Sequence, residues 1–300
     1  MVGQVSSLKT GVKYKKTPIG KIPVDWEVVR LGDVCDIIGG STPSTKRKEY
    51  WGGHIPFATP TDITSLRGRE ISITKQSITP EGLSSCGARL LPAGSILLTR
   101  RATLGACAIN SACAINTKSM ATNQGFASLV CSEKAYNWFI FYKMISLKRE
   151  LQTLGSGSTF KEVSKGNIRS LFLAIPSPPE QKKIAEILTT VDDAIEKTTQ
   201  IIDKTKELKK GMMQRLLTHG IGHKKIKLLS STQAVPIINK GEFSKIRTAI
   251  PPIYEQKKIG DILSSIDSRI EKESNHKEQL DLLKKGLMLL LLTGKLRVTV

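Results

Sequence analysis

A repeat of about forty residues constrains the fold of this chain more than any other feature. Residues 175–218 and 250–293 align without a gap at an offset of 75 residues, and 21 of the 44 paired positions are identical. Both copies contain Glu-Gln-Lys-Lys-Ile near their start and finish with Leu-Leu-Thr. Because internal repetition marks a structural unit that occurs more than once, we expect two copies of one element.

The repeat predicts a long amphipathic helix. Apolar residues recur at spacings of three and four over about five heptads, from Ile184 in the first copy and from Ile259 in the second. Ser177 and Glu180 can cap the first helix start. A helix of about 39 residues spans roughly 58 Å, more than an ordinary core covers. We therefore predict that the two helices pair as an antiparallel coiled coil, with one long helix in a bundle as the alternative. Three polar residues are predicted on the seam of the second helix: Arg269, Glu273 and His276.

These helices resemble those of the DNA-specificity subunits of type I restriction–modification systems. Shorter motifs in the first half of the chain carry the rest of the resemblance, at residues 20–26, 39–44, 50–51, 55–56, 99–101 and 123–124. In that family, two target-recognition domains are separated by two long helices. This chain departs from the pattern, because only about thirty residues stand between its helices where a second recognition domain is usual.

The resemblance implies an α/β (α+β) target-recognition domain followed by two long helices. We expect a basic N-terminal arm at residues 1–19 and the recognition domain at 20–174. The first helix is expected at 175–219, a linker or small cap at 220–249, and the second helix with a C-terminal tail at 250–300. Local patterns within the recognition domain predict helices over residues 31–38 and 136–154 and strands over 26–31, 95–99, 126–130 and 171–175.

The charge of the chain indicates a polyanionic partner, with double-stranded DNA favoured over a membrane. The formal net charge is +20, and residues 1–174 hold 23 Lys and Arg against 11 Asp and Glu, so the larger excess precedes the helices. No apolar run is long enough to cross a bilayer. The five cysteines show no metal-ligand spacing and are expected as reduced thiols, which favours a cytoplasm, and the resemblance implies a prokaryotic one: Cys35, Cys86, Cys107, Cys113 and Cys131.

Three segments combine small, hydroxyl-bearing and cationic residues, which suit close approach to a phosphate backbone. The first could instead be an ordinary surface turn, and an arginine of the second could instead pair with a carboxylate at the edge of the core. The resemblance favours DNA contacts. The candidate DNA-binding residues are Gly40, Ser41, Thr42, Ser44, Lys46, Arg47, Arg100, Arg101, Thr103, Ser156, Ser158, Thr159 and Lys161.

Motifs for catalysis are missing from the sequence. It has no Asn/Asp-Pro-Pro-aromatic motif for base methylation, no P-loop and no metal-ligand pattern. We therefore expect a non-catalytic adaptor without a cofactor. The resemblance implies methyltransferase subunits that carry S-adenosylmethionine, and a motor/nuclease subunit, as partners. A homodimer would restore a second recognition domain. The alternatives are a truncated remnant or DNA-binding regulator, and a stand-alone restriction enzyme.

Overall fold

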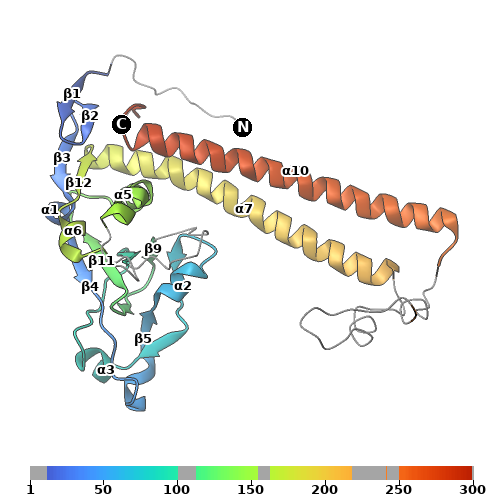
Figure 1. Cartoon of the computed structure of the whole chain (residues 1–300), viewed down its shortest axis with the longest axis horizontal. Helices are drawn as coiled ribbons and strands as arrows, with labels where there is room; N and C mark the ends of the chain where they lie inside the picture. Colours follow the sequence, from blue (N-terminus) through green and yellow to red (C-terminus); the bar gives the residue numbers. More distant parts are fainter. Residues whose placement is uncertain (1–11, 101–112, 155–162, 218–240, 242–249, 299–300) are drawn as a thin grey trace. The chain divides into compact units, whose positions relative to one another are not determined.

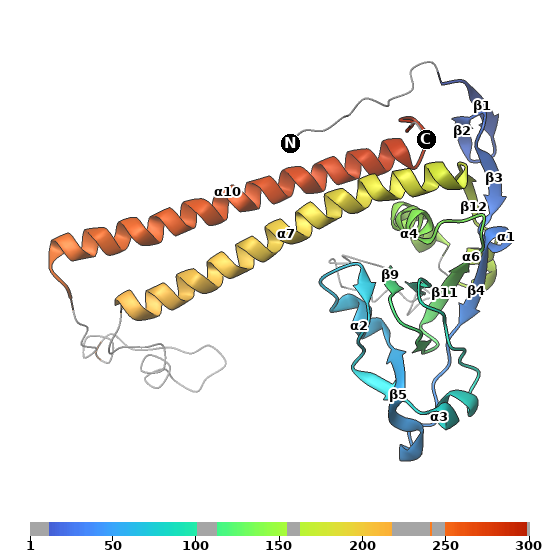
Figure 2. The same ribbon diagram turned by 180° about the vertical axis from the view of Figure 1, so that it is seen from behind.

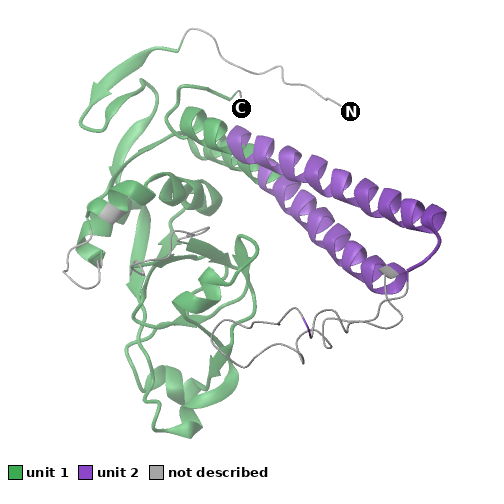
Figure 3. Ribbon diagram, turned by 45° about the vertical axis from the view of Figure 1, so that its right-hand side comes forward, with its two compact units in different colours: residues 1–190, 284–300 green, residues 191–283 purple. Residues whose placement is uncertain are grey.

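The computed structural model describes residues 12–100, 113–154, 163–217, 241 and 250–298 (Figure 1). The chain forms two compact units (Figure 3). Unit 1 comprises Met1–Thr190 and Lys284–Val300, and unit 2 comprises Val191–Leu283. Among the described residues, no helix combines the length and apolar character that crossing a membrane would require.

A five-stranded sheet forms the centre of unit 1. Its strand order is β4 (Cys35–Gly39), β11 (Phe126–Cys131), β8 (Ile96–Thr99), β9 (Cys113–Asn116) and β6 (Glu70–Ile71). Neighbouring strands are antiparallel except β6 and β9, which are parallel. The strands β8 and β9 are apolar and buried along almost their whole length, as a short apolar run predicts for a strand inside a core.

Three smaller sheets accompany the central one. The strands β10 (Ala121–Thr122), β5 (Trp51–Ala58) and β7 (Gln76–Ile78) form the first. β12 (Phe172–Ile175) pairs antiparallel with β3 (Glu27–Arg30), and β1 (Tyr14–Thr17) forms a hairpin with β2 (Gly20–Pro23). The strands predicted near residues 26–31 and 171–175 are therefore both present, and they pair with each other.

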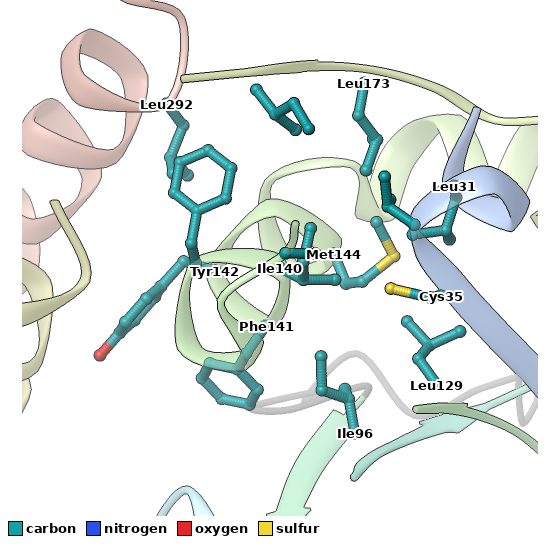
Figure 4. Packing of buried hydrophobic residues seen from close by; sticks show 14 of the residues in the cluster. Leu31, Cys35, Ile96, Leu129, Ile140, Phe141, Tyr142, Met144, Leu173 and Leu292 are labelled. Atoms are coloured by element: carbon teal, nitrogen blue, oxygen red, sulfur yellow. The ribbon is translucent and has the colours of Figure 1, made fainter. Parts of the chain in front are cut away.

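The helix α4 (Asn137–Ser146) supplies much of the core of unit 1. Its buried face packs among β4, β8, β11 and β12, and it also meets Leu292 just beyond the end of α10 (Figure 4). The labelled side chains in this cluster include Ile140, Phe141, Tyr142 and Met144. Short helices complete the unit: α1 (Leu31–Val34), η1 (Lys48–Tyr50), α2 (Pro60–Thr64), α3 (Pro80–Ser84), α5 (Lys148–Thr153) and α6 (Lys165–Arg169).

Two local predictions were wrong. The helix predicted over residues 31–38 ends at Val34, and the following residues form β4, because they pair with β11 from Cys35 to Gly39. Tertiary pairing overrides helix propensity here. The single helix predicted over residues 136–154 is divided at Leu147, whose backbone leaves the helical conformation between α4 and α5.

The repeat forms the two long helices, α7 (Pro178–Leu217) of 40 residues and α10 (Ile253–Leu291) of 39 residues. Within unit 2 their segments run antiparallel (Figures 1 and 2), and Lys209 Nζ donates to both carboxylate oxygens of Asp267, at 2.5 and 2.6 Å. Buried and half-buried positions recur every three or four residues, at 191, 195, 198, 202, 205, 209 and 212 in α7 and at 259, 263, 266, 270, 273, 277 and 280 in α10. This spacing is the seam of a coiled coil. The predicted antiparallel pair is confirmed.

The polar residues of the seam differ from those predicted. Glu273 is half-buried on the seam, as expected, whereas Arg269 and His276 are exposed. Lys277 occupies the next seam position and forms an ion pair with Asp281, one turn along the same helix, at 2.8 Å. Arg269 and His276 each lie one position before a seam residue of the structure, at 270 and 277.

Candidate nucleic-acid interface

Three strand ends of the central sheet meet at one edge of unit 1. Gly39, the last residue of β4, is opposite Ala127, and Thr99, the last residue of β8, is opposite Phe126 at the start of β11. Because neighbouring strands here are antiparallel, the loop after β4, Arg100 after β8 and the turn before β11 lie at the same edge. The loop edge consists of residues 40–47, Arg100 and residues 123–125.

The first part of the β4 loop is fixed against the turn before β11. Ser41 N donates to Thr122 O at 3.0 Å, and Thr42 Oγ1 donates to Gln124 Oε1 at 2.6 Å. A Cβ atom on Gly40 would lie 2.1 Å from Asn123 O and 2.2 Å from Thr122 O, far inside van der Waals contact. Glycine is therefore required at this position, and these three candidate residues hold the loop in place.

The second part of the β4 loop faces solvent. Ser44, Lys46 and Arg47 are exposed. The backbone beneath them is held, because Trp51 Nε1 donates to Ser44 O at 3.2 Å. The Arg47 guanidinium lies 5.6 Å from the ring centroid of Tyr50, and Glu49 lies 3.8 Å away in an exposed ion pair. Such an exposed pair contributes little stability and leaves the cation accessible to an anionic ligand.

Arg100 joins the loop edge to the chain that follows the third candidate segment. Its backbone N–H donates to Gly125 O at 2.8 Å, and its carbonyl accepts from Val163 N at 3.1 Å. Its side chain is half-buried. Val163 directly follows residues 155–162 in sequence, so the chain immediately after that segment reaches this edge. The other candidates lie outside the described residues: Arg101, Thr103, Ser156, Ser158, Thr159 and Lys161.

Two residues were missing from the candidate set: Gln124 in the loop edge, and Lys165 beside the end of β4. Gln124 is exposed and bonds the Thr42 side chain, although residues 123–124 had already been singled out as a motif. Lys165 is exposed, and its Nζ lies 3.1 Å from the position that a Cβ on Gly39 would take. Its spacing of four residues from Lys161 is the only signal in the sequence that could have indicated it.

The opposite edge of the sheet carries a different surface. A groove of about 700 Å³ lies where β8 begins and β11 ends, lined by residues from 92–95, 130–137 and 178–182. It shares no residue with the loop edge. No cluster of three or more metal-ligating side chains occurs within the part of the chain that the structure describes.

An ion cluster centred on the buried Arg297 joins the ends of the long helices to the chain before β3 in unit 1. Arg297 donates to Glu180 at 2.6 and 2.8 Å and to Asp25 at 2.6 and 2.8 Å. These hydrogen bonds, first to Glu180 and then to Asp25, raise the pKa of Arg297. Because Asp25 precedes β3, Glu180 lies in the first turn of α7 and Arg297 follows α10, the cluster connects three distant parts of the sequence.

Two further side chains of unit 1 bond the backbone at the same junction. Gln181, fully buried, accepts from Tyr136 N at 2.8 Å and donates to Lys134 O and Pro176 O, each at 2.9 Å. Lys143 Nζ donates to Leu292 O at 2.5 Å. Burial lowers the pKa of Lys143 to about 8, although Glu150 opposes this shift. Together with the ion cluster, these residues form the helix root.

The second repeat has the same local start but no such environment. Gln256 Nε2 donates to Pro251 O at 2.7 Å, which matches the bond from Gln181 to Pro176. Gln256 and Glu255 are nevertheless exposed. Ile250 is 74% exposed, whereas Ile175 at the equivalent position is 5% exposed. The second repeat therefore forms the same local helix start as the first. Within the described residues, a domain buries only the first of these starts.

Comparisons with known proteins agree with this architecture. The model of the type I restriction modification DNA specificity domain matches residues 23–207 and 204–282. The MjaIX specificity subunit of a type I restriction enzyme from Methanocaldococcus jannaschii is 39% identical over 197 residues, covering 64% of this chain and 44% of the relative. The putative MjaX specificity subunit of the same organism is 29% identical over 209 residues, covering 68% and 45%. The chain thus spans less than half the length of these relatives.

A solved structure shares the fold. The crystal structure of the S subunit of a type I restriction-modification system from M. genitalium superposes with a TM-score of 0.55 at 11% identity. The match covers 89% of this chain and 96% of that one. At this identity the likeness concerns the fold alone, a mixed α/β domain with long helices.

Proposed function

This chain belongs to the family of type I restriction modification DNA specificity domains, and from that premise we propose that it recognises a DNA sequence through the loop edge of unit 1. The side chains offered there are cations, hydroxyls and amides, which contact phosphates and base edges. The chain contributes recognition and no chemistry. Its relatives are named specificity subunits, and the family is a non-catalytic component of type I systems.

The observation that carries this proposal is the meeting of separate loops at one edge. The β4 loop, Arg100 and the chain beginning at Val163 are far apart in sequence, yet backbone hydrogen bonds join them. Gly40, Ser41 and Thr42 fix the loop, and Ser44, Lys46 and Arg47 are exposed for contact. We propose the same role for the candidates outside the described residues, because Arg100 and Val163, the described residues that border their segments in sequence, lie at this edge.

We further propose the domain division given by the sequence. Residues 20–174 form the recognition domain, and residues 175–219 and 250–300 contain the helices that hold it. Residues 1–19 are assigned as a basic arm, although β1 of the hairpin falls within them. Residues 220–249 are assigned as a linker or small cap, and apart from Gly241 they lie outside the described residues.

The partners follow from the family role. Specificity subunits of type I systems act with methyltransferase and restriction subunits on DNA, and we propose the same assembly for this chain. S-adenosylmethionine would be bound by the methyltransferase subunit, and the complex would act in a prokaryotic cytoplasm. A single recognition domain fits one half-site. A homodimer would present two domains about a two-fold axis, and its target would be an interrupted palindrome.

Methyl transfer tests the proposal. The purified chain should transfer no methyl group to DNA in the presence of S-adenosylmethionine. Addition of the cognate methyltransferase subunit should produce methylation at a defined sequence, whereas the methyltransferase alone should not. Methylation or cleavage of DNA by this chain alone would reject the adaptor role and favour an enzyme.

A further inference from the structure

The β1–β2 hairpin of unit 1 concentrates positive charge away from the loop edge. Residues 12–24 contain four lysines and no acidic residue. All four side chains are exposed, and none forms a salt bridge within the described part of the chain. An exposed fifth lysine follows Gly294, which contacts the hairpin. The five residues are Lys13, Lys15, Lys16, Lys21 and Lys295.

The register of the hairpin places two of these charges directly opposite each other. Lys16 faces Lys21 across the two strands. Like charges at directly opposed positions destabilise an antiparallel pair. A bound polyanion would neutralise this repulsion. Solubility alone does not require two lysines at directly opposed positions. The register therefore points to an anionic ligand.

The hairpin is also held rigidly enough to present its charges in a fixed arrangement. Val24 N donates to Lys13 O at 3.0 Å, and Tyr14 OH donates to Gly294 O at 3.3 Å. Ile22 is buried in the main core cluster. Gly294 has a φ of +69°, and a Cβ there would lie 2.5 Å from Pro23 Cγ, so the C-terminal tail packs closely on β2.

We propose that the β1–β2 hairpin is a second DNA-binding site, which contacts phosphates outside the bases that the loop edge reads. This inference rests on the proposed function, because it assigns further contacts to the same DNA. β3, α1 and β4 lead from the hairpin to the loop edge, and both views show the hairpin beyond the far end of that run (Figures 1 and 2). A duplex running along unit 1 would reach both surfaces.

The chemistry of the hairpin favours DNA over an acidic protein surface. Lysine is depleted in protein–protein interfaces, where its strong hydration must be removed. Phosphates are contacted by lysine with release of condensed counterions, which supplies affinity without burial of the ammonium group. The five exposed lysines, on and beside a hairpin held to the core by Ile22, therefore fit contact with phosphates better than contact with a protein surface.

The test compares two full-length variants of equal charge. Lys16→Gln/Lys21→Gln removes the opposed pair, and Lys204→Gln/Lys206→Gln removes two exposed lysines of α7 in unit 2. Binding to a duplex of about 40 base pairs and arbitrary sequence is followed by fluorescence anisotropy from 50 to 200 mM salt. Each lost phosphate contact should reduce the slope of log affinity against log salt by about 0.9. The hairpin variant should therefore lose about 2 units of slope, so its affinity deficit relative to wild type should be about tenfold larger at 50 mM than at 200 mM salt, whereas the α7 variant keeps the wild-type slope.

The outcomes separate this inference from the proposed function. If the wild-type chain binds DNA and the hairpin variant shows the same slope and affinity, the second site is refuted and the loop edge is not affected. Equal losses in both variants would also refute it, because they would reflect net charge alone. Normal DNA binding with weakened methyltransferase assembly would refute it in favour of a protein partner. If the wild-type chain binds no duplex at low salt, the proposed function itself fails.

Discussion

Gln181 and Gln256 provide a matched pair of substitutions within one chain. Both are the fourth residue of a long helix, and both bond the carbonyl of a proline five residues earlier. Replacement by alanine changes helix propensity equally at the two positions. Any difference in stability therefore measures the environment of the side chain, which is buried at the helix root only in the first copy.

The structure predicts unequal effects. Gln181→Ala removes three hydrogen bonds and leaves the Tyr136 amide and the carbonyls of Lys134 and Pro176 without that partner. A lost hydrogen bond costs about 1 kcal/mol, and more where a buried group stays unsatisfied. We expect the free energy of unfolding of unit 1 to fall by about 3 kcal/mol. Gln256→Ala removes one exposed bond and should cost less than about 1 kcal/mol.

Tryptophan fluorescence during urea unfolding is the appropriate assay. The three tryptophans, Trp26, Trp51 and Trp138, all belong to unit 1, so their signal reports on the domain that Gln181 supports. The denaturation midpoint should fall clearly for Gln181→Ala and stay near wild type for Gln256→Ala. Equal midpoints for the two variants would refute the reasoning that a domain covers only the first helix start.

Three further predictions concern the buried lysine, the loop and the assembly state. Lys143 has a lowered pKa, so the folded chain binds fewer protons than the unfolded chain between about pH 8 and 10.5, and its stability should rise with pH there. The difference in free energy of unfolding between wild type and Lys143→Met, measured by urea unfolding, should therefore move in favour of the wild type by up to about 3 kcal/mol as the pH rises across that window. A pH-independent difference would contradict this. Gly40→Ala should cost about 1–3 kcal/mol and weaken DNA binding, because its Cβ meets backbone. Gly68→Ala, where the space is open, serves as the control, and equal midpoints and affinities would contradict the close packing. Light scattering of the free chain and of its methyltransferase complex should give two specificity chains per complex, and mapping of the methylated sites should give an interrupted palindrome; one chain per complex with a single-part site would exclude the homodimer.

The long helices could be predicted from the sequence because their signal is local and repeated. Spacings of three and four residues persist over several turns, and Ser177 and Glu180, the predicted capping residues, precede the apolar positions, although the Glu180 carboxylate bonds Arg297 in the structure. The seam of the second helix was predicted only in part, because Arg269 and His276 are exposed. The predicted seam has spacings of four and then three residues from Arg269, whereas the structure has three and then four from Ile270, the apolar neighbour of Arg269, so the two share only Glu273.

The arrangement of the site depended on pairing that the sequence does not encode locally. The three candidate segments were selected separately, and only the order β4–β11–β8 brings the first two to one edge. The same pairing makes residues 35–38, which were predicted to be helical, part of a strand. The helix root was not predicted, because Arg297, Glu180 and Asp25 are far apart in sequence and no local pattern indicates that they form an ion cluster.

Selection of bound duplexes from a random library tests the central claim, that the loop edge reads DNA sequence. The wild-type complex with methyltransferase should enrich one defined motif. Lys46→Gln/Arg47→Gln and Arg100→Ala should each fold normally, and at least one should relax the preference at particular positions, at a cost of about 1–3 kcal/mol for a lost base contact. Retention of the complete wild-type motif and affinity by both variants would contradict the account.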